Sequence, residues 1–280
     1  MSATHKLPSP PSAAPSPAAS LVQFAVALAR NAVPVWGFLG RGWSPATTLV
    51  VYWFETLVGT LLIALRMEIH RHLTHFRGYS VEEGPATISV SSSGGAQRPL
   101  HLGYVKAFLV GALGFILVHG VFLLALVAIV LPQTADGGTV DREALRQGVL
   151  ATSGFLALGF LVDLVGLSRR PFAWIRSMAE GAFSRIVIVH MTIIIGMIAA
   201  MLFDRARPLF TVFVGLKLLA DISAHVPQWR PKQAPAWMSR HLSPAGGKGK
   251  PGSEDFATYW QRTEAAERAR EAEDETVEKA

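Results

Sequence analysis

Long apolar runs recur along the chain and are separated by short polar segments. A helix needs about 20 apolar residues to cross a bilayer, and most of the runs are close to that length. They predict six membrane-spanning helices, at Leu21–Leu39, Ala46–Leu65, Ala107–Leu131, Gln147–Leu167, Ile186–Phe203 and Pro208–Val226. The pattern therefore predicts an all-α fold, a polytopic integral membrane bundle of about six transmembrane helices.

The segments outside these runs divide the chain further. Residues 1–20 are rich in Pro, Ala and Ser, which predicts a disordered tail. Residues 21–228 hold the transmembrane domain, 229–252 a basic linker rich in Gly and Pro, and 253–280 a charged cytoplasmic helix or a disordered tail. Between the fourth and fifth runs, Phe172, Trp174, Ile175 and Met178 share one helical face. We expect a short helix there that lies in the membrane interface.

Composition supports a membrane location. Half of the residues are hydrophobic and only 16% are charged, against about 25% charged in ordinary soluble domains. This argues against a disordered chain and against a soluble enzyme. The chain has no cysteine, which excludes disulfides, thiolate metal sites and cysteine nucleophiles. The formal charge of +6 fits basic cytoplasmic loops, and we expect no binding of nucleic acid.

Orientation follows from the lysines and arginines in the flanks of the runs. They concentrate in the connections after the second and fourth runs and after the sixth run, and the first tail adds Lys6 on the same side. Because cytoplasmic loops carry the excess of Lys and Arg, both termini are predicted to be cytoplasmic. Arginine also outnumbers lysine, which suggests a GC-rich bacterial genome. The expected location is therefore the bacterial plasma (inner) membrane.

Six charged residues lie within or at the edge of the apolar runs. Each charge at mid-bilayer costs at least about 2.5–3.5 kcal/mol unless it is paired or hydrated, so these side chains should face one another. At about 1.5 Å per residue, Arg30, Glu55 and Lys217 share a depth near mid-membrane. We expect Glu55 to contact Arg30 or Lys217. The resulting network is read first as structural and alternatively as a proton or ion relay.

A second, shallower layer lies about 8–9 Å inside the cytoplasmic helix ends, by the same rise. It contains Asp163, His190 and Asp221, from three consecutive spans, which predicts an acid/base catalytic site open to the cytosol. Lys217, Asp221 and His225 have i, i+4, i+8 spacing and so share a helical face. His190, Asp221 and His225 could bind a divalent metal such as zinc, or pair with one another without a metal.

The other histidines have simpler interpretations. His119, beside a glycine, is typical of a packed and hydrogen-bonded histidine. His70, His72 and His75 lie near two arginines, and we expect a solvated basic face attracted to anionic lipid headgroups.

Several short motifs carry a resemblance to a known family. They are Gly42-Trp43-Ser44, Tyr52-Trp53-Phe54-Glu55, His119-Gly120-Val121-Phe122, Arg185-Ile186 with His190, and Lys217 with Asp221 and His225. In their order and placement over about residues 30–228, the chain resembles a family of uncharacterised bacterial multi-pass membrane proteins, classed as a domain of unknown function. The resemblance implies a membrane location and this pattern of spans. It implies no activity.

Three functions remain open at this point. The first is a membrane enzyme that acts on a lipid-like substrate through Asp163, His190 and Asp221. The second is a small proton-coupled transporter in which Glu55 and Lys217 form a switchable ion pair. The third is a structural or partner-binding membrane subunit. The expected partners are the lipid bilayer and, alternatively, a protein bound by the charged C-terminal tail.

Overall fold

The computed structural model describes residues 17–80, 103–133, 138–203, 207–223, 231, 233–242 and 256–277. These residues form α-helices, short 3-10 or π turns, and an isolated β-bridge. The α-helices are α1 (Pro17–Gly40), α2 (Pro45–Thr74), α3 (Tyr104–Ala125), α4 (Arg142–Leu164), α5 (Phe172–Phe203), α6 (Arg207–Ser223), α7 (Ala236–Leu242) and α8 (Phe256–Asp274). The short turns are η1 (Arg77–Tyr79), η2 (Leu126–Val130), η3 (Leu131–Gln133) and η4 (Leu167–Arg169).

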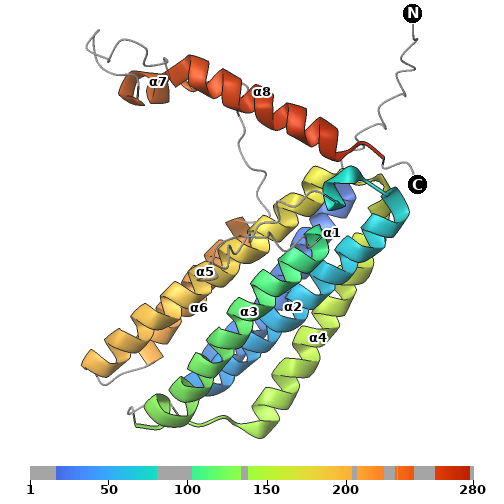
Figure 1. Cartoon of the computed structure of the whole chain (residues 1–280). Coiled ribbons are helices and arrows are strands. Elements are labelled where there is room, and N and C mark those ends of the chain that lie inside the picture. The colour runs from blue at the N-terminus through green and yellow to red at the C-terminus, as the bar shows by residue number, and fades with distance from the viewer. Residues whose placement is uncertain are drawn as a thin grey trace, which may run out of the picture.

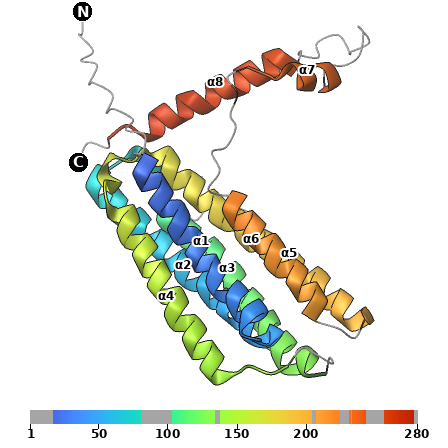
Figure 2. The ribbon, with the colours of Figure 1, turned by 180° about the vertical axis from the view of Figure 1, so that it is seen from behind.

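Helices α1 to α6 form one elongated bundle (Figures 1 and 2). Helix α2 packs against α1, α3, α4 and α5, and so lies at its centre. Helix α4 packs on α1 and α2, whereas α5 and α6 pair with each other, and α6 also packs on α1. Helix α8 lies across the end of the bundle at which α5 begins. The bundle thus has α4 on one side and the α5–α6 pair on another.

The Gly-Trp-Ser motif forms the turn from α1 into α2, and each of its residues has a structural role there. Gly42 has φ +69°, a conformation that favours glycine. A side chain on Gly37 or Gly148 would overlap the Trp43 ring, at 2.3 and 2.8 Å from the added carbon, so these glycines let α1 and α4 close on the indole. The Ser44 hydroxyl accepts a hydrogen bond from the Thr47 amide and caps α2.

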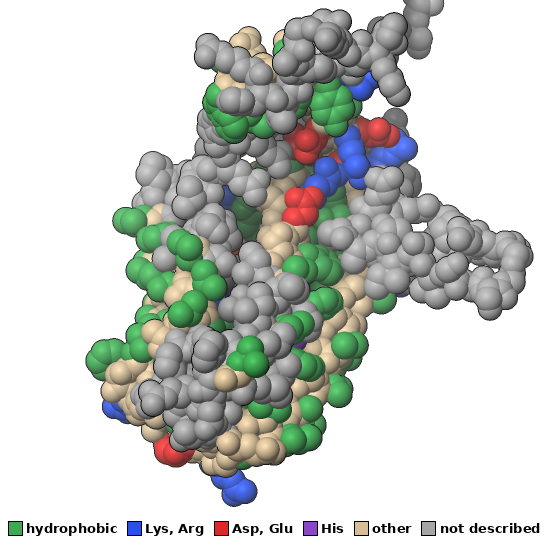
Figure 3. All heavy atoms as spheres, turned by 90° about the vertical axis from the view of Figure 1, so that its left-hand side faces the viewer, with side chains coloured by type: hydrophobic (Ala, Val, Ile, Leu, Met, Phe, Trp, Pro, Cys, Tyr) green, Lys and Arg blue, Asp and Glu red, His purple; other side chains and the backbone are tan. Residues whose placement is uncertain are grey.

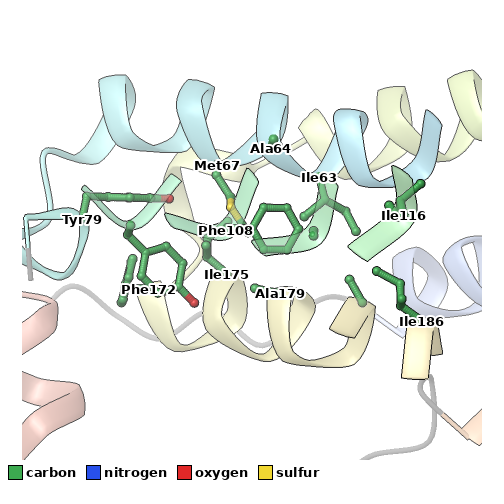
Figure 4. Packing of buried hydrophobic residues seen from close by; sticks show 13 residues of the cluster. Ile63, Ala64, Met67, Tyr79, Phe108, Ile116, Phe172, Ile175, Ala179 and Ile186 are labelled. Atoms are coloured by element: carbon green, nitrogen blue, oxygen red, sulfur yellow. The ribbon is translucent and has the colours of Figure 1, made fainter. Parts of the chain in front are cut away.

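Two apolar clusters fill the bundle. One joins α1, α2, α6 and the end of α3, and includes Phe38, Tyr52, Leu123, Phe210 and Phe213. The other joins α2, α3 and α5 (Figure 4). Its buried members are Ile63, Ala64, Met67, Tyr79, Tyr104, Phe108, Ala112, Ile116, Phe172, Ile175, Ala179, Ala182 and Ile186. Together the clusters fix α2 against all of its neighbours but α4.

Large apolar side chains are also exposed along the bundle. On α3, Leu117, Val118 and Val121 all face outward, with Val118 72% exposed. Among the described residues, α2, α4 and the helix over Tyr104–Gln133 are long and apolar enough to cross a membrane. The predicted all-α class is confirmed, and these three helices coincide with the second, third and fourth predicted spans. The first, fifth and sixth spans stay predictions.

The predicted interface helix at residues 172–178 is wrong. Phe172 begins α5, which continues without a break to Phe203. Phe172 and Ile175 lie inside the second apolar cluster and are almost completely buried. The apolar face seen in the sequence packs on α2 and α3, because an amphipathic pattern is the same for a helix on a membrane and a helix on a protein core.

Candidate functional site

The carboxylate of Glu55 lies between two cations. Arg30 Nε lies 3.1 Å from Glu55 Oε1, and Lys217 Nζ lies 3.3 Å from Oε2. Lys217 Nζ also donates a hydrogen bond of 2.8 Å to Asn31 Oδ1. These residues come from α1, α2 and α6. Glu55, which was expected to contact Arg30 or Lys217, contacts both, and Asn31 adds a neutral acceptor that the sequence did not single out.

This Glu55 network is buried but is not fully hydrogen-bonded. The side chains of Glu55, Lys217 and Arg30 are 5%, 2% and 16% exposed. Lys217 Nζ donates a long hydrogen bond of 3.5 Å to Glu55 Oε1. Glu55 Oε2 and Arg30 Nη2 have no hydrogen-bond partner among the described residues. Buried polar atoms in native proteins are nearly always paired. Arg30 Nη2 and Glu55 Oε2 are therefore buried polar atoms without an aligned protein partner.

A small pocket lies next to the Glu55 network. Lys217 Nζ sits 4.5 Å from the centre of the Tyr52 ring, and Tyr52 helps to line a pocket of about 20 Å³. The pocket lies between α2, α3 and α5, and its polar lining includes Thr56 and His119. A volume of this size holds about one water molecule. Tyr52 thus contacts both the Glu55 network and this mostly apolar pocket.

The Tyr-Trp-Phe-Glu and His-Gly motifs meet at this pocket. The Trp53 indole Nε1 donates a hydrogen bond of 3.1 Å to the Ile116 carbonyl. A side-chain carbon on Gly120 would lie 2.9 Å from the same indole. Gly120 is therefore needed for α3 to approach Trp53, and this contact sets the position of His119 on the pocket wall.

Asp163 forms a second ion pair, with Arg66. Arg66 Nη2 lies 3.0 Å from Asp163 Oδ2, and this ion pair joins α2 to α4. The guanidinium also lies over the Phe160 ring, 5.3 Å from its centre. The sequence did not single out Arg66. Arg66 and Asp163 lie near the same ends of their helices, but shared depth alone does not select Arg66 as the partner.

The predicted meeting of Asp163, His190 and Asp221 stays a prediction. The side chains of His190 and Asp221, and all of His225, lie outside the described residues. Asp163 itself faces α2, and α4 packs mainly on α1 and α2. Within the described part of the chain, no group of three His, Asp or Glu residues is placed to hold a metal. Zinc at His190, Asp221 and His225 remains an expectation from the sequence.

His70 does not belong to a solvated basic face. Its ring is fully buried, with Nδ1 2.8 Å from the Tyr79 hydroxyl and Nε2 3.0 Å from the Arg170 carbonyl. His72 is exposed, as expected, and contacts Glu68. The chain folds back after α2 through His75, which has φ +53°, and this return places Tyr79 over His70. Burial raises the pKa of the Tyr79 hydroxyl above its usual range.

The helices and their exposed apolar faces indicate a membrane protein, built from a helical bundle with a buried charge network. The chain belongs to a family of unknown function, DUF6498, whose model matches residues 13–237. No curated protein and no solved structure matches the chain. The family model covers all of α1 to α6, so both ion-pair sites lie within it.

Proposed function

We propose that this protein spans the bacterial plasma membrane six times, with both termini in the cytoplasm. Three long apolar helices and the outward apolar side chains support the membrane location. The arginines at the end of the bundle where α5 begins, including Arg71, Arg77, Arg169 and Arg170, support a cytoplasmic position for that end. Cysteines introduced at Ser92 and Lys250 should be labelled from the cytoplasm, and one at Asp136 from the other side. Labelling of Ser92 and Asp136 from the same side would refute this topology.

We further propose that the protein is a small proton-coupled transporter, with Glu55 as the group that binds the proton. The observation that carries this proposal is a buried carboxylate between two cations, with polar atoms that lack hydrogen bonds. The pocket beside Tyr52 supplies a small space next to the network, and Thr56 and His119 are the polar residues on its mostly apolar wall.

The coupling step follows from charge. When Glu55 is ionised, it attracts both Arg30 and Lys217, and so holds α6 against α1 and α2. A proton on the carboxylate removes that attraction, because a neutral acid cannot balance either cation. The α5–α6 pair, which carries Ile186 on the pocket wall, can then move away and open the pocket.

A cysteine placed in the pocket tests the proposal. The chain has no native cysteine, so Thr56→Cys can be labelled alone with a membrane-impermeant thiol reagent in proteoliposomes. We expect slow labelling at neutral pH and labelling at least tenfold faster when Glu55→Gln is added. The neutral amide imitates the protonated carboxyl.

Glu68→Gln in the same Thr56→Cys background is the matched control. Glu68 is on α2 as well, but its carboxylate is exposed and pairs with Arg71 and His72. It should leave the labelling rate unchanged. If Glu55→Gln protein that is folded by circular dichroism labels at the control rate, the Glu55 network does not close the pocket and the transport proposal is wrong.

A further inference from the structure

The C-terminal segment is attached to the end of the bundle where α5 begins. Arg77 forms an ion pair of 3.2 Å with Glu273, and its backbone amide donates to the Thr276 carbonyl at 2.8 Å. Phe76 and Val277 form an antiparallel bridge. Asp274 is buried and pairs with Arg176, one turn into α5. The segment expected to be a charged cytoplasmic helix or a disordered tail is helical and has a defined docking site on its own chain.

This attachment fixes how α8 lies relative to the bundle. Figures 1 and 2 both show α8 running crosswise to the bundle helices from its docked end. Figure 3 shows charged side chains gathered between this segment and the bundle. Since Asp274 binds within the first turns of α5, α8 lies level with the helix ends and parallel to the expected membrane plane.

The two ends of α8 differ in chemistry. The docked end carries the acidic residues that meet the arginines of the bundle. The far end is aromatic: Tyr259 is 50% exposed, Phe256 contacts Trp260, and on α7 Trp237 is 61% exposed. Trp260 Nε1 donates to the Pro231 carbonyl, which ties α8 to the segment before α7. Arg262 lies over the Tyr259 ring.

We infer that this aromatic end of α7–α8, defined by Trp237, Phe256, Tyr259 and Trp260, lies in the headgroup region of the cytoplasmic leaflet. Trp and Tyr rings concentrate at membrane–water interfaces, where one edge is apolar and the other wet. An arginine beside an exposed tyrosine suits anionic headgroups. The inference rests on the proposed membrane topology, because that topology places this end of the bundle at the cytoplasmic leaflet.

Spin labels on two faces of α8 test the inference. At 100° per residue, Thr263 lies on the same face as Phe256, Tyr259 and Trp260, and Ala265 lies on the opposite face; both residues are exposed. Labels at Thr263→Cys and Ala265→Cys would be compared in nanodiscs that contain anionic lipid. We expect the first label to collide with lipid-dissolved oxygen at least twice as often as the second, and to be protected from a water-soluble nickel chelate.

A third label separates this inference from the proposal on which it rests. Leu158 on α4 is exposed and apolar within a candidate span, so Leu158→Cys should be lipid-exposed. If it is, and the labels on both faces of α8 are equally exposed to water, the inference is overturned and the aromatic rings are left for a protein partner. If Leu158→Cys is itself exposed to water, the proposed membrane location fails, and the inference fails with it.

Discussion

The Glu55 network makes a quantitative prediction about stability. In Glu55→Gln, Arg30 and Lys217 keep their charges and lose the carboxylate that lies within 3.3 Å of both. Lys217 remains buried and Arg30 only partly exposed, and the side chain that balanced them becomes a neutral amide. Removing one partner of a buried ion pair costs about 3–5 kcal/mol. We expect a loss of that size in the free energy of unfolding.

A double variant, Glu55→Gln with Lys217→Met, separates the effect of the unbalanced charge from the effect of the changed side-chain shape. Adding Lys217→Met to Glu55→Gln removes one uncompensated cation and returns the excess charge of the trio to its original value. Methionine also fills irregular apolar space well. We expect the double variant to recover about 1–3 kcal/mol of the loss, the usual size of a coupling between residues in contact.

Unfolding in mixed micelles, followed by circular dichroism, measures these differences. The exposed Glu68→Gln on the same helix is the control, and it should change stability by less than about 0.5 kcal/mol. If Lys217→Met adds its own full cost to that of Glu55→Gln, the two residues are not coupled. The ion pair would then contribute nothing that holds α6 in place.

Three further variants test other contacts. Asp163→Asn should lower the free energy of unfolding by about 3–5 kcal/mol, because it leaves Arg66 without its carboxylate partner. Adding Arg66→Met should recover part of that loss. Purely additive effects of the two substitutions in the same unfolding assay would contradict the pairing. Gly120→Ala should lower the free energy of unfolding by about 1–3 kcal/mol through overlap with Trp53. Gly114 lies on the same helix with open space around it, so Gly114→Ala should be neutral or stabilising. Equal effects of the two substitutions would argue against the close contact. Burial and the nearby Glu271 and Asp274 raise the pKa of Glu275, so docking of α8 should weaken as pH rises from the ordinary glutamate pKa through this raised value. The proteolysis rate of α8 measures the docking, and Glu275→Gln should remove its pH dependence. An unchanged pH profile in Glu275→Gln would show that Glu275 does not contribute.

The Glu55 network was predictable from the sequence because the physical constraint was strong. A charge in hydrocarbon is costly, and helical rise places Arg30, Glu55 and Lys217 at one depth. Depth does not choose partners around the bundle, however. It grouped Asp163 with His190 and Asp221, and did not indicate that α4 would pack on α2 and bring Asp163 to Arg66.

The first turns of α5 and the C-terminal segment show a second limit. An apolar stripe at Phe172 and Ile175 indicates that one face is buried, but the burying surface can be lipid or protein. The charged sequence of α8 has the same ambiguity, because its Asp274 binds an arginine 98 residues away. Pairing between distant segments is decided by the tertiary fold, and local patterns do not encode it.

The contacts of α6 also predict on which side the pocket should open. Near its beginning, Phe210 packs on Phe38 and Phe213 packs on Tyr52, with ring centres 5.1 and 5.4 Å apart. Lys217 lies further along the helix, toward the end that we assign to the cytoplasm. Protonation of Glu55 weakens only its ion pair with Lys217, since the ring contacts of Phe210 and Phe213 carry no charge. The cytoplasmic half of α6 should therefore separate first, with the aromatic contacts as the hinge.

Thiol labelling from each side of the membrane measures on which side the pocket opens. In Glu55→Gln protein, Thr56→Cys should react with an impermeant thiol reagent in inverted membrane vesicles, which expose the cytoplasmic face, and should stay protected in right-side-out vesicles. Phe213→Ala should weaken the hinge and allow reaction from both sides. If the Glu55→Gln protein reacts only in right-side-out vesicles, the aromatic contacts of α6 are the ones that release, and the order of separation argued from these contacts is wrong.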